Sequence, residues 1–223
     1  MKRNIRLTIE YDGSRYQGWQ RLGGDSNANT IQGKLESVLS KMTGEDVNIN
    51  GSGRTDAGVH AYGQVANFHT ECMMSVNEIK DYLTKYLPSD ISIVEVSEAS
   101  ERFHSRLNAK EKTYLYRIAI PGVSNVFERK YLWYFPETLD IKKMEEAASL
   151  LIGTHDFKGF SSIKKTKKST IRTIYNIEIK KTKKEIQITY TGNGFLHNMV
   201  RILTGTLVEV GCGKIKPEDI TKA

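Results

Sequence analysis

Apolar residues recur along the chain with two different periods. Between Ile5 and Tyr11 every second residue is apolar, which is typical of a strand with one buried face. From Thr30 onwards the apolar residues follow the spacing of a helix. In the first half, the predicted strands cover residues 5–11, 46–50, 63–69 and 91–97, and the predicted helices cover residues 30–41 and 75–86. The stretch from Asp12 to Asn29 has no period, and a loop of that length inside a compact domain suggests a functional segment.

The second half repeats this order of elements. Its predicted strands cover residues 113–120, 171–179 and 185–191, and its predicted helices cover residues 140–152 and 195–210. We therefore expect an α+β fold of two pseudo-repeated ferredoxin-like (RRM-like) β-α-β-β-α-β halves. The halves are expected to join in one mostly antiparallel sheet with a cleft between them. The repeat requires one more strand after the last helix. None is found, so the last C-terminal strand is expected to be missing, which would leave an open sheet edge and a less stable chain.

The two halves define the expected domains, residues 1–105 and residues 106–223. A charged segment, residues 101–112, crosses from one half to the other. Within it, Phe103-His104-Ser105-Arg106 has two interpretations, a lining of the cleft or a plain linker.

The positive net charge of the chain predicts a polyanionic partner. The chain of 223 residues has a net charge of +7, which favours nucleic acid over a membrane. Between Lys158 and Lys184, ten Lys and Arg residues stand against a single acid, Glu178. The candidates for phosphate contacts in this run are Lys164, Lys165, Lys167 and Lys168. A basic face that is merely solvated has the same composition, so both interpretations stay open at this point.

Several other classes of protein are not indicated. No apolar run reaches the roughly eighteen residues of a membrane span, and Met1-Lys2-Arg3 leads directly into a strand pattern instead of a signal peptide. Cys72 and Cys212 lie far apart, and neither forms a cluster with histidines. We therefore expect reduced cysteines, no metal and a cytoplasmic protein.

Residues 51–60, Gly-Ser-Gly-Arg-Thr-Asp-Ala-Gly-Val-His, form the most distinctive stretch of the chain. Three glycines mark a backbone that turns sharply and allows another molecule to approach closely. Asp56 is the only carboxylate in the stretch, and Arg54 precedes it by two residues. An Asp in such a turn commonly bonds to its own backbone. The alternative is a single acid held on a tight loop at the mouth of a strand. The stretch lacks the third glycine of a dinucleotide fingerprint and the Gly-Lys-Ser/Thr of a phosphate loop.

The whole stretch resembles the GRTDxGVHA signature of the TruA family of tRNA pseudouridine synthases. Four further segments resemble the family's pattern and occur in the same order as in the family. They are Tyr11-Asp12-Gly13 with Gly18-Trp19-Gln20, Lys112-Thr113-Tyr114-Leu115-Tyr116, Gly153-Thr154-His155-Asp156-Phe157, and Phe195-Leu196-His197-Asn198-Met199-Val200-Arg201. The resemblance covers nearly the whole chain. The family's closing strand, which supplies an apolar side chain to the pocket, has no counterpart here.

The resemblance implies an isomerase that converts uridines 38, 39 and 40 of the tRNA anticodon stem-loop to pseudouridine. It also implies a homodimer with the RNA lying across both subunits. Asp56 would be the catalytic carboxylate, Arg201 the cation that stabilises its ionised form, and Tyr114 the platform for the flipped base. Without the motif, Tyr114 would be interpreted as a core strand residue and Arg201 as a surface arginine. Arg54 would fill the space that the base vacates or hold a phosphate.

The reaction breaks the C1′–N1 bond of uridine and joins C1′ to C5, so no cofactor is needed. The carboxylate either attacks C1′ or takes the C2′ proton. Two other functions remain open on the sequence. One is a non-catalytic RNA-binding protein, since ferredoxin-like sheets also bind RNA, although no RNP1 octapeptide occurs. The other is an inactive, truncated remnant of the enzyme.

Overall fold

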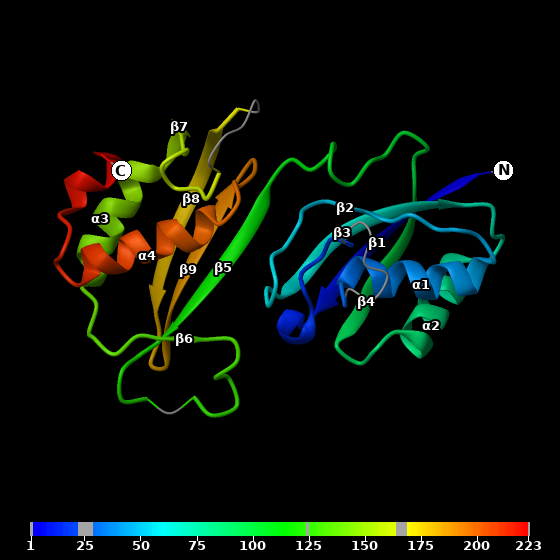
Figure 1. Ribbon diagram of the computed structural model, residues 1–223, viewed down its shortest axis with the longest axis horizontal. Coiled ribbons are helices and arrows are strands. Elements are labelled where there is room, and N and C mark those ends of the chain that lie inside the picture. Colours follow the sequence, from blue (N-terminus) through cyan, green and yellow to red (C-terminus); the bar gives the residue numbers. More distant parts are fainter. Residues whose placement is uncertain (1, 22–28, 124, 164–168, 223) are drawn as a thin grey trace. The chain divides into compact units, whose positions relative to one another are not determined.

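The computed structural model describes residues 2–21, 29–123, 125–163 and 169–222. The chain divides into two compact units, Met1–Ala109 and Lys110–Ala223, here called the first and the second unit (Figure 1). The α+β class predicted by the two periods is confirmed. Within the described residues each unit has a sheet of its own, and the expectation of one sheet that joins the two halves stays a prediction.

The first unit is a four-stranded antiparallel sheet covered by two helices. Its elements are β1 (Arg3–Tyr11), the 3-10 helix η1 (Gly13–Arg15), α1 (Ile31–Thr43), β2 (Asn50–Gly51), β3 (Ala61–Thr70), α2 (Val76–Tyr86) and β4 (Ile91–Ala99). The strand order is β2-β3-β1-β4, which places β1 in the interior of the sheet. The alternating residues Ile5, Leu7 and Ile9 are fully buried with Leu35 of α1 and Ile79 of α2. Both helices therefore pack on the face predicted by the alternation in β1.

A buried pair of asparagines holds the segment that follows β4. Asn4 on β1 donates from its amide to the carbonyls of Ser100 (2.9 Å) and Phe103 (2.8 Å). Asn67 on β3 donates to Asn4 Oδ1 (2.9 Å) and accepts from the Ser105 N–H (2.9 Å). Ser105 is 2% exposed. The chain is thus fixed to the first sheet as far as Ser105, so the plain-linker interpretation was wrong for this residue.

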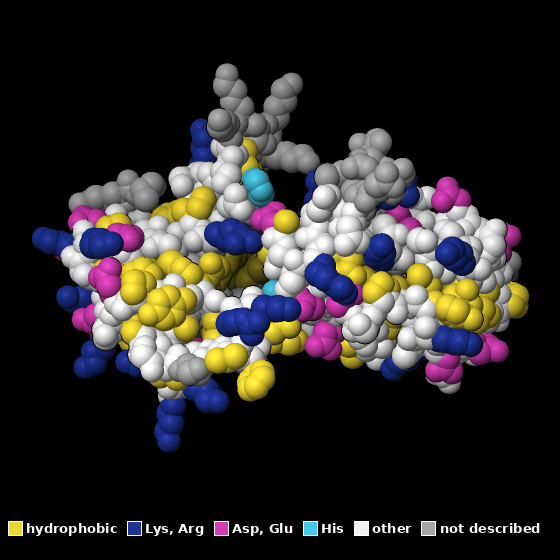
Figure 2. Space-filling model, turned by 60° about the horizontal axis from the view of Figure 1, so that its bottom comes forward, with side chains coloured by type: hydrophobic (Ala, Val, Ile, Leu, Met, Phe, Trp, Pro, Cys, Tyr) yellow, Lys and Arg dark blue, Asp and Glu magenta, His cyan; other side chains and the backbone are white. Residues whose placement is uncertain are grey.

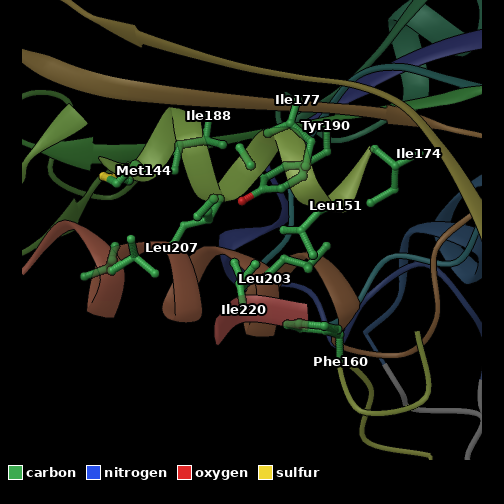
Figure 3. Close-up of a cluster of buried hydrophobic side chains, with 14 of the residues drawn as sticks. Met144, Leu151, Phe160, Ile174, Ile177, Ile188, Tyr190, Leu203, Leu207 and Ile220 are labelled. Atoms are coloured by element: carbon green, nitrogen blue, oxygen red, sulfur yellow. The ribbon is translucent and has the colours of Figure 1, made fainter. Parts of the chain in front are cut away.

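The second unit is a five-stranded sheet packed against two helices. Its elements are β5 (Lys112–Ala119), β6 (Trp133–Tyr134), α3 (Ile141–Leu151), β7 (Gly153–Asp156), β8 (Ile171–Lys181), β9 (Glu185–Gly192), α4 (Met199–Gly211) and the 3-10 helix η2 (Pro217–Lys222). The order is β6-β5-β9-β8-β7, with only the β5–β6 pair parallel. Figure 3 shows Ile188 and Tyr190 of the sheet facing Leu151 of α3 and Leu203 and Leu207 of α4.

Three short strands and one helix boundary differ from the prediction. The strand predicted over residues 46–50 is present only as β2, Asn50–Gly51. β6 and β7 have two and four residues, which is too short for a period to be recognised. The last helix begins at Met199 instead of residue 195, because Asn198 has a left-handed backbone (φ 60°) and the helix cannot continue through it. After α4, the described residues contain η2 and no strand. Beside β5, β6 pairs only with Ile118 and Ala119.

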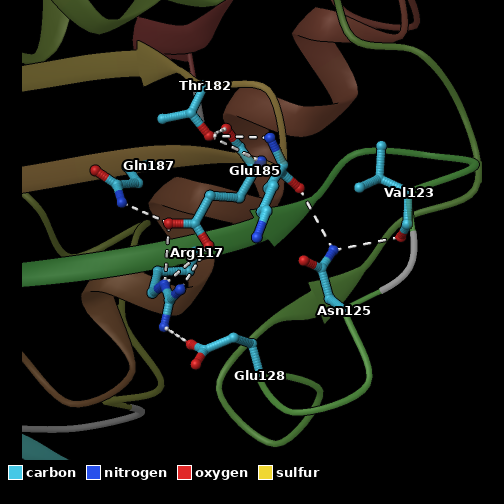
Figure 4. A network of polar contacts seen from close by, with 8 residues as sticks. Arg117, Val123, Asn125, Glu128, Thr182, Glu185 and Gln187 are labelled. Atoms are coloured by element: carbon cyan, nitrogen blue, oxygen red, sulfur yellow. Dashed lines mark hydrogen bonds and ion pairs between the residues drawn. The ribbon is translucent and has the colours of Figure 1, made fainter.

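A polar network ties β5 to the β8–β9 hairpin (Figure 4). Arg117 on β5 donates to both carboxylate oxygens of the buried Glu185 (2.7–3.2 Å) and to Glu128 (2.9 Å). Burial alone would raise the pKa of Glu185, but the hydrogen bonds from Arg117 and Gln187 outweigh it and lower that pKa. The hydrogen bonds to Glu185 and Glu128 raise the pKa of Arg117. The buried charge is therefore compensated, as its position requires.

Candidate active site

The loop that carries Asp56, residues 52–60, is held at its start by Gln64. The loop connects β2 to β3, where Gly51 pairs with Ala66. The Ser52 N–H donates to the Val65 carbonyl and the Ser52 hydroxyl donates to Gln64 Oε1, both at 2.7 Å. The Gln64 amide in turn donates to the Gly53 carbonyl at 2.7 Å. Gln64 is 8% exposed, so these bonds are largely shielded from water.

Asp56 begins a tight turn. Its carbonyl accepts a hydrogen bond from the Val59 N–H at 3.2 Å, and Gly58 in the third position has a φ of 74°. A positive φ at that position is typical of a type II turn and explains the glycine. Asp56 itself is exposed, as is Arg54. The turn therefore presents the carboxylate on the surface of the first unit.

Residues 12–19 lie directly against the Asp56 loop and support its backbone. Trp19 donates its backbone N–H to the Thr55 carbonyl (3.0 Å), and the Tyr16 carbonyl accepts from Gly58 (3.3 Å). A Cβ on Gly18 would lie 2.5 Å from the Thr55 carbonyl oxygen, and Gly18 has a φ of 99°. The Trp19 ring is buried (1% exposed) and would touch any side chain at Gly51. Residues 12–19 and the Asp56 loop are thus in direct backbone contact, although they lie about forty residues apart in the sequence.

Gly13→Ala is expected to lower the melting temperature strongly, because the new Cβ would lie 2.0 Å from the Val59 carbonyl oxygen. Backbone cannot move aside as a flexible side chain can, so a loss of about 3 kcal/mol in the free energy of unfolding is expected. Gly205→Ala in α4 is the control. Its Cβ would enter open space, and Ala favours a helix by about 0.5–1 kcal/mol. Urea denaturation measures both. Equal stability of the Gly13 variant and the wild type would contradict the close packing.

His60 and Asp12 close the other end of the loop. His60 Nδ1 lies 3.1 Å from the Gly13 N–H and 3.0 Å from Asp12 Oδ1. Asp12 Oδ1 accepts from the Ser14 N–H at 2.9 Å, capping η1. Asp12 and Gly13 of the Tyr-Asp-Gly segment thus contact His60, the last residue of the Asp56 loop.

Asp90, which directly precedes β4, holds residues 12–19 to the first sheet. Its carboxylate accepts from the Tyr16 hydroxyl and from Arg15, both at 2.6 Å, and its carbonyl accepts from the Asp12 N–H at 2.9 Å. Burial raises the pKa of Asp90, but the hydrogen bonds from Tyr16 and Arg15 outweigh burial, so that pKa lies below its usual value. Burial and the bond to Asp90 raise the pKa of Tyr16. No sequence motif pointed to Asp90.

In the second unit, two of the motif segments come together at Tyr114. This residue lies on β5 and is half-buried, with its ring packed against the main core of the unit. The Phe195 ring meets the Tyr114 ring edge to face, with centroids 5.0 Å apart and planes at 75°. Edge-to-face pairs are a favourable aromatic geometry and fix the orientation of both rings. The strand segment and the segment before α4 are therefore parts of one local structure.

Arg201 lies in the first turn of α4 and is exposed. Within the described residues of its own unit, its guanidinium has no hydrogen bond or ion pair. The positive end of the helix dipole disfavours a cation there by about 0.3–1 kcal/mol. Asn198, the N-cap residue, gives the helix no side-chain cap and instead donates to Ser162 Oγ at 2.9 Å. The helix therefore gains no local stability from this cation.

The structure thus places Asp56 and Arg54 in the first unit and Tyr114 and Arg201 in the second, and each pair is described within its own unit. The lysines at 164, 165, 167 and 168 lie outside the described residues. Sequence reasoning missed Gln64 and Asp90, which hold the Asp56 loop and residues 12–19. In the described ranges, no group of three or more His, Cys, Asp or Glu side chains is arranged for a metal ion. The helices in those ranges are too short or too polar to cross a membrane.

Comparison with known proteins connects these segments to one family. Residues 7–108 and 147–223 match the family described as tRNA pseudouridine synthase. The chain is 53% identical over 220 residues to tRNA pseudouridine synthase A 1 of Clostridium tetani. The aligned stretch covers 99% of this chain and 89% of that protein. It is 51% identical over 217 residues to tRNA pseudouridine synthase A 2 of Bacillus anthracis, covering 97% and 88%. The identity to tRNA pseudouridine synthase A of Bacillus sp. (strain KSM-64) is 52% over 217 residues, again covering 97% of this chain and 88% of that protein.

Proposed function

The chain belongs to the tRNA pseudouridine synthase family and is an isomerase that acts on uridine in tRNA, and we propose that Asp56 is its catalytic carboxylate. The observation that carries this proposal is the Asp56 loop. A single exposed carboxylate begins a turn that contains a glycine. The backbone of the loop is held from two sides, by Gln64 and by residues 12–19. Such a fixed acid suits a reaction at one sugar carbon.

The reaction needs a negative charge beside the ribose. While the C1′–N1 bond breaks, the sugar becomes electron-deficient, and a carboxylate can attack C1′ or take the C2′ proton. After the base has turned, C1′ bonds to C5, the C5 proton leaves and N1 is protonated. No electrons enter or leave, so these steps need only groups that position, stabilise and transfer protons.

Tyr114 and Arg201 are proposed to serve the same reaction, Tyr114 as the platform for the flipped base and Arg201 as the cation that stabilises the ionised carboxylate. A flipped uracil loses its stacking in the RNA, at a cost of a few kcal/mol, and an aromatic face recovers part of it. The edge-to-face contact with Phe195 holds the Tyr114 ring for this purpose. Arg201 brings a guanidinium to the positive end of α4, where both charges favour an anion. Arg54, exposed two residues before Asp56, is proposed to fill the place of the flipped base or to hold a phosphate.

The finer description of the substrate is also a proposal. The family resemblance supports uridines 38, 39 and 40 of the anticodon stem-loop as targets, a homodimer as the working form and the cytoplasm as its location. The domain division at residues 105 and 106, with the Asp56 loop in one domain and the basic loop in the other, has the same standing. A ferredoxin-like pseudo-repeat is supported by the order β2-β3-β1-β4 and by the similar run β5-β9-β8 with α3 and α4.

Basic side chains are proposed to bind the phosphates of tRNA. Figure 2 shows Lys and Arg side chains projecting at many points of the visible face. The β8–β9 hairpin carries exposed lysines at its turn, where Lys181, Lys183 and Lys184 follow one another closely. Lys164, Lys165, Lys167 and Lys168 belong to the same basic run of the sequence. Phosphate contacts of this kind position the RNA and do not read its sequence.

Replacing Lys164, Lys165, Lys167 and Lys168 together by Ala is expected to weaken binding of all RNA sequences alike. Each lost phosphate contact should reduce the log–log slope of affinity against salt by roughly 0.7 to 0.9. The measurement is a titration of tRNA binding at several salt concentrations. A control with the same charge change replaces four exposed helix lysines, Lys34, Lys41, Lys85 and Lys142. An unchanged slope in the first variant would show that its lysines are merely solvated.

Release of tritium from tRNA labelled at uridine C5 tests the proposed function as a whole, because the C5 proton leaves only when C1′ bonds to C5. Wild-type protein is expected to release tritium without any added cofactor. Binding of tRNA without release would instead support the non-catalytic RNA-binding alternative for this chain.

A further inference from the structure

We propose that Tyr11 is a positioning residue for catalysis, which acts on the Asp56 carboxylate through the hydroxyl of Thr55. Tyr11 Oη and Thr55 Oγ1 form a hydrogen bond of 2.8 Å between β1 and the Asp56 loop. The inference rests on the proposed catalytic role of Asp56, and it assigns a function to a tyrosine that the reaction itself does not use.

Thr55 is the residue through which the fold controls Asp56. Its carbonyl accepts from the Trp19 N–H at 3.0 Å, and its side chain bonds to Tyr11. On the far side of Asp56, the turn is closed by Val59 N–H at 3.2 Å. The Cα atoms of Thr55 and Asp56 are separated by one peptide unit, about 3.8 Å. A rotation or shift of Thr55 therefore moves the Asp56 side chain directly.

Tyr11 can serve as a fixed reference point because its ring is buried in the core of the first unit. It lies at the end of the interior strand β1, paired with Ala61 on β3 and with Ile91 on β4. The side chain is 3% exposed, and the Trp19 ring lies beside it with centroids 6.2 Å apart. The phenol oxygen is thereby carried from the hydrophobic core to the loop at one defined place. A phenylalanine would fill the same space but could not hold Thr55.

The hydroxyl pair is suited to positioning more than to stability. One such hydrogen bond contributes only about 1 kcal/mol to folding. A reacting group displaced by about 1 Å can slow a reaction by as much as about 10²-fold. Loss of the Tyr11–Thr55 bond is therefore expected to change the rate more than the folding equilibrium, and to leave the affinity for tRNA nearly unchanged.

The test compares Tyr11→Phe, Thr55→Val, the double variant and Thr55→Ser by steady-state tritium release. We expect kcat to fall about tenfold in both single variants, equivalent to about 1.4 kcal/mol, with KM within about twofold of the wild type. Because both changes remove one bond, the double variant should lose no more than either single variant. Thr55→Ser keeps the hydroxyl and should restore most of kcat.

Thr70→Val is the matched control for loss of a buried hydroxyl. Thr70 lies at the opposite end of β3, is fully buried, and donates to Glu45 at 2.9 Å. Its variant should melt at a lower temperature and keep the wild-type kcat. If Tyr11→Phe folds poorly, the comparison of Thr55→Val with Thr55→Ser carries the same test, since Thr55 lies in a partly exposed loop.

Wild-type kcat in Tyr11→Phe and Thr55→Val would overturn the inference. So would losses that appear only in melting temperature or KM, or that add fully in the double variant. These results are separable from a failure of the proposed function. Activity retained by an Asp56→Asn variant would remove the catalytic assignment itself, whereas an inactive Asp56→Asn variant beside fully active Tyr11 and Thr55 variants would remove only the positioning role.

Discussion

Asp56→Asn is expected to reduce the rate of tritium release by at least about 10³-fold while tRNA affinity stays within about threefold of the wild type. Asn has nearly the same shape, and the turn is closed by the Asp56 carbonyl, which the substitution keeps. Only the negative charge is lost. A neutral amide can neither attack C1′ nor accept the C2′ proton, so the chemical step fails while the RNA-binding surface remains.

Single-turnover tritium release measures this rate, and titration with labelled tRNA measures the affinity. Asp81→Asn on α2 is the control, since Asp81 is exposed and the substitution makes the same change in net charge. Both variants should melt close to the wild type. Release by the Asp56 variant at a rate near that of the Asp81 variant would exclude Asp56 as the catalytic carboxylate.

Arg201→Ala is expected to lower the rate about 10²-fold, with a smaller loss of affinity, because the guanidinium is proposed to act on charge at the reacting centre. Its thermal stability should stay equal or rise slightly. Ala is the better helix former, and a cation is removed from the positive end of α4. A fall in activity without a fall in melting temperature would separate this role from a structural one.

Lys142→Ala controls for removal of a cation from the first turn of a helix, because Lys142 occupies that place in α3 and is exposed. Arg201→Lys tests the fork of the guanidinium, since Lys keeps the charge and loses the paired donors. We expect an intermediate rate for Arg201→Lys. Full activity of Arg201→Ala would show that the residue is an ordinary surface arginine.

Long periodic segments could be predicted from the sequence, and boundaries set by single residues could not. The alternation through Ile5, Leu7 and Ile9 identified β1 and its buried face correctly. At the last helix, the apolar spacing continues back to Phe195, so nothing in the pattern signals the left-handed backbone of Asn198. The connection after β4 was also undetermined, because the amides that hold it come from Asn4 and Asn67, far away in the sequence.

The candidate site was identified by motif, whereas its support was not. Asp56 stood out as one acid among glycines, and the family resemblance assigned roles to Tyr114 and Arg201. No local pattern links Gln64 or Asp90 to the Asp56 loop, because their hydrogen bonds arise only when β2, β3 and β4 are in place. Residues of this kind are set by tertiary structure, which a single sequence does not display.

The close approach of residues 12–19 to residues 51–60 has a consequence for how such an enzyme can evolve or be engineered. A side chain at Gly13 or Gly18 would collide with the backbone of the other segment, so neither segment can drift independently of the other. The two stretches are far apart in the sequence, but each constrains which residues the other can accept. A graft of the Asp56 loop alone into a foreign scaffold would therefore lack its matching surface, and a graft of both stretches would still need counterparts of Gln64 and Asp90, which hold them to the sheet.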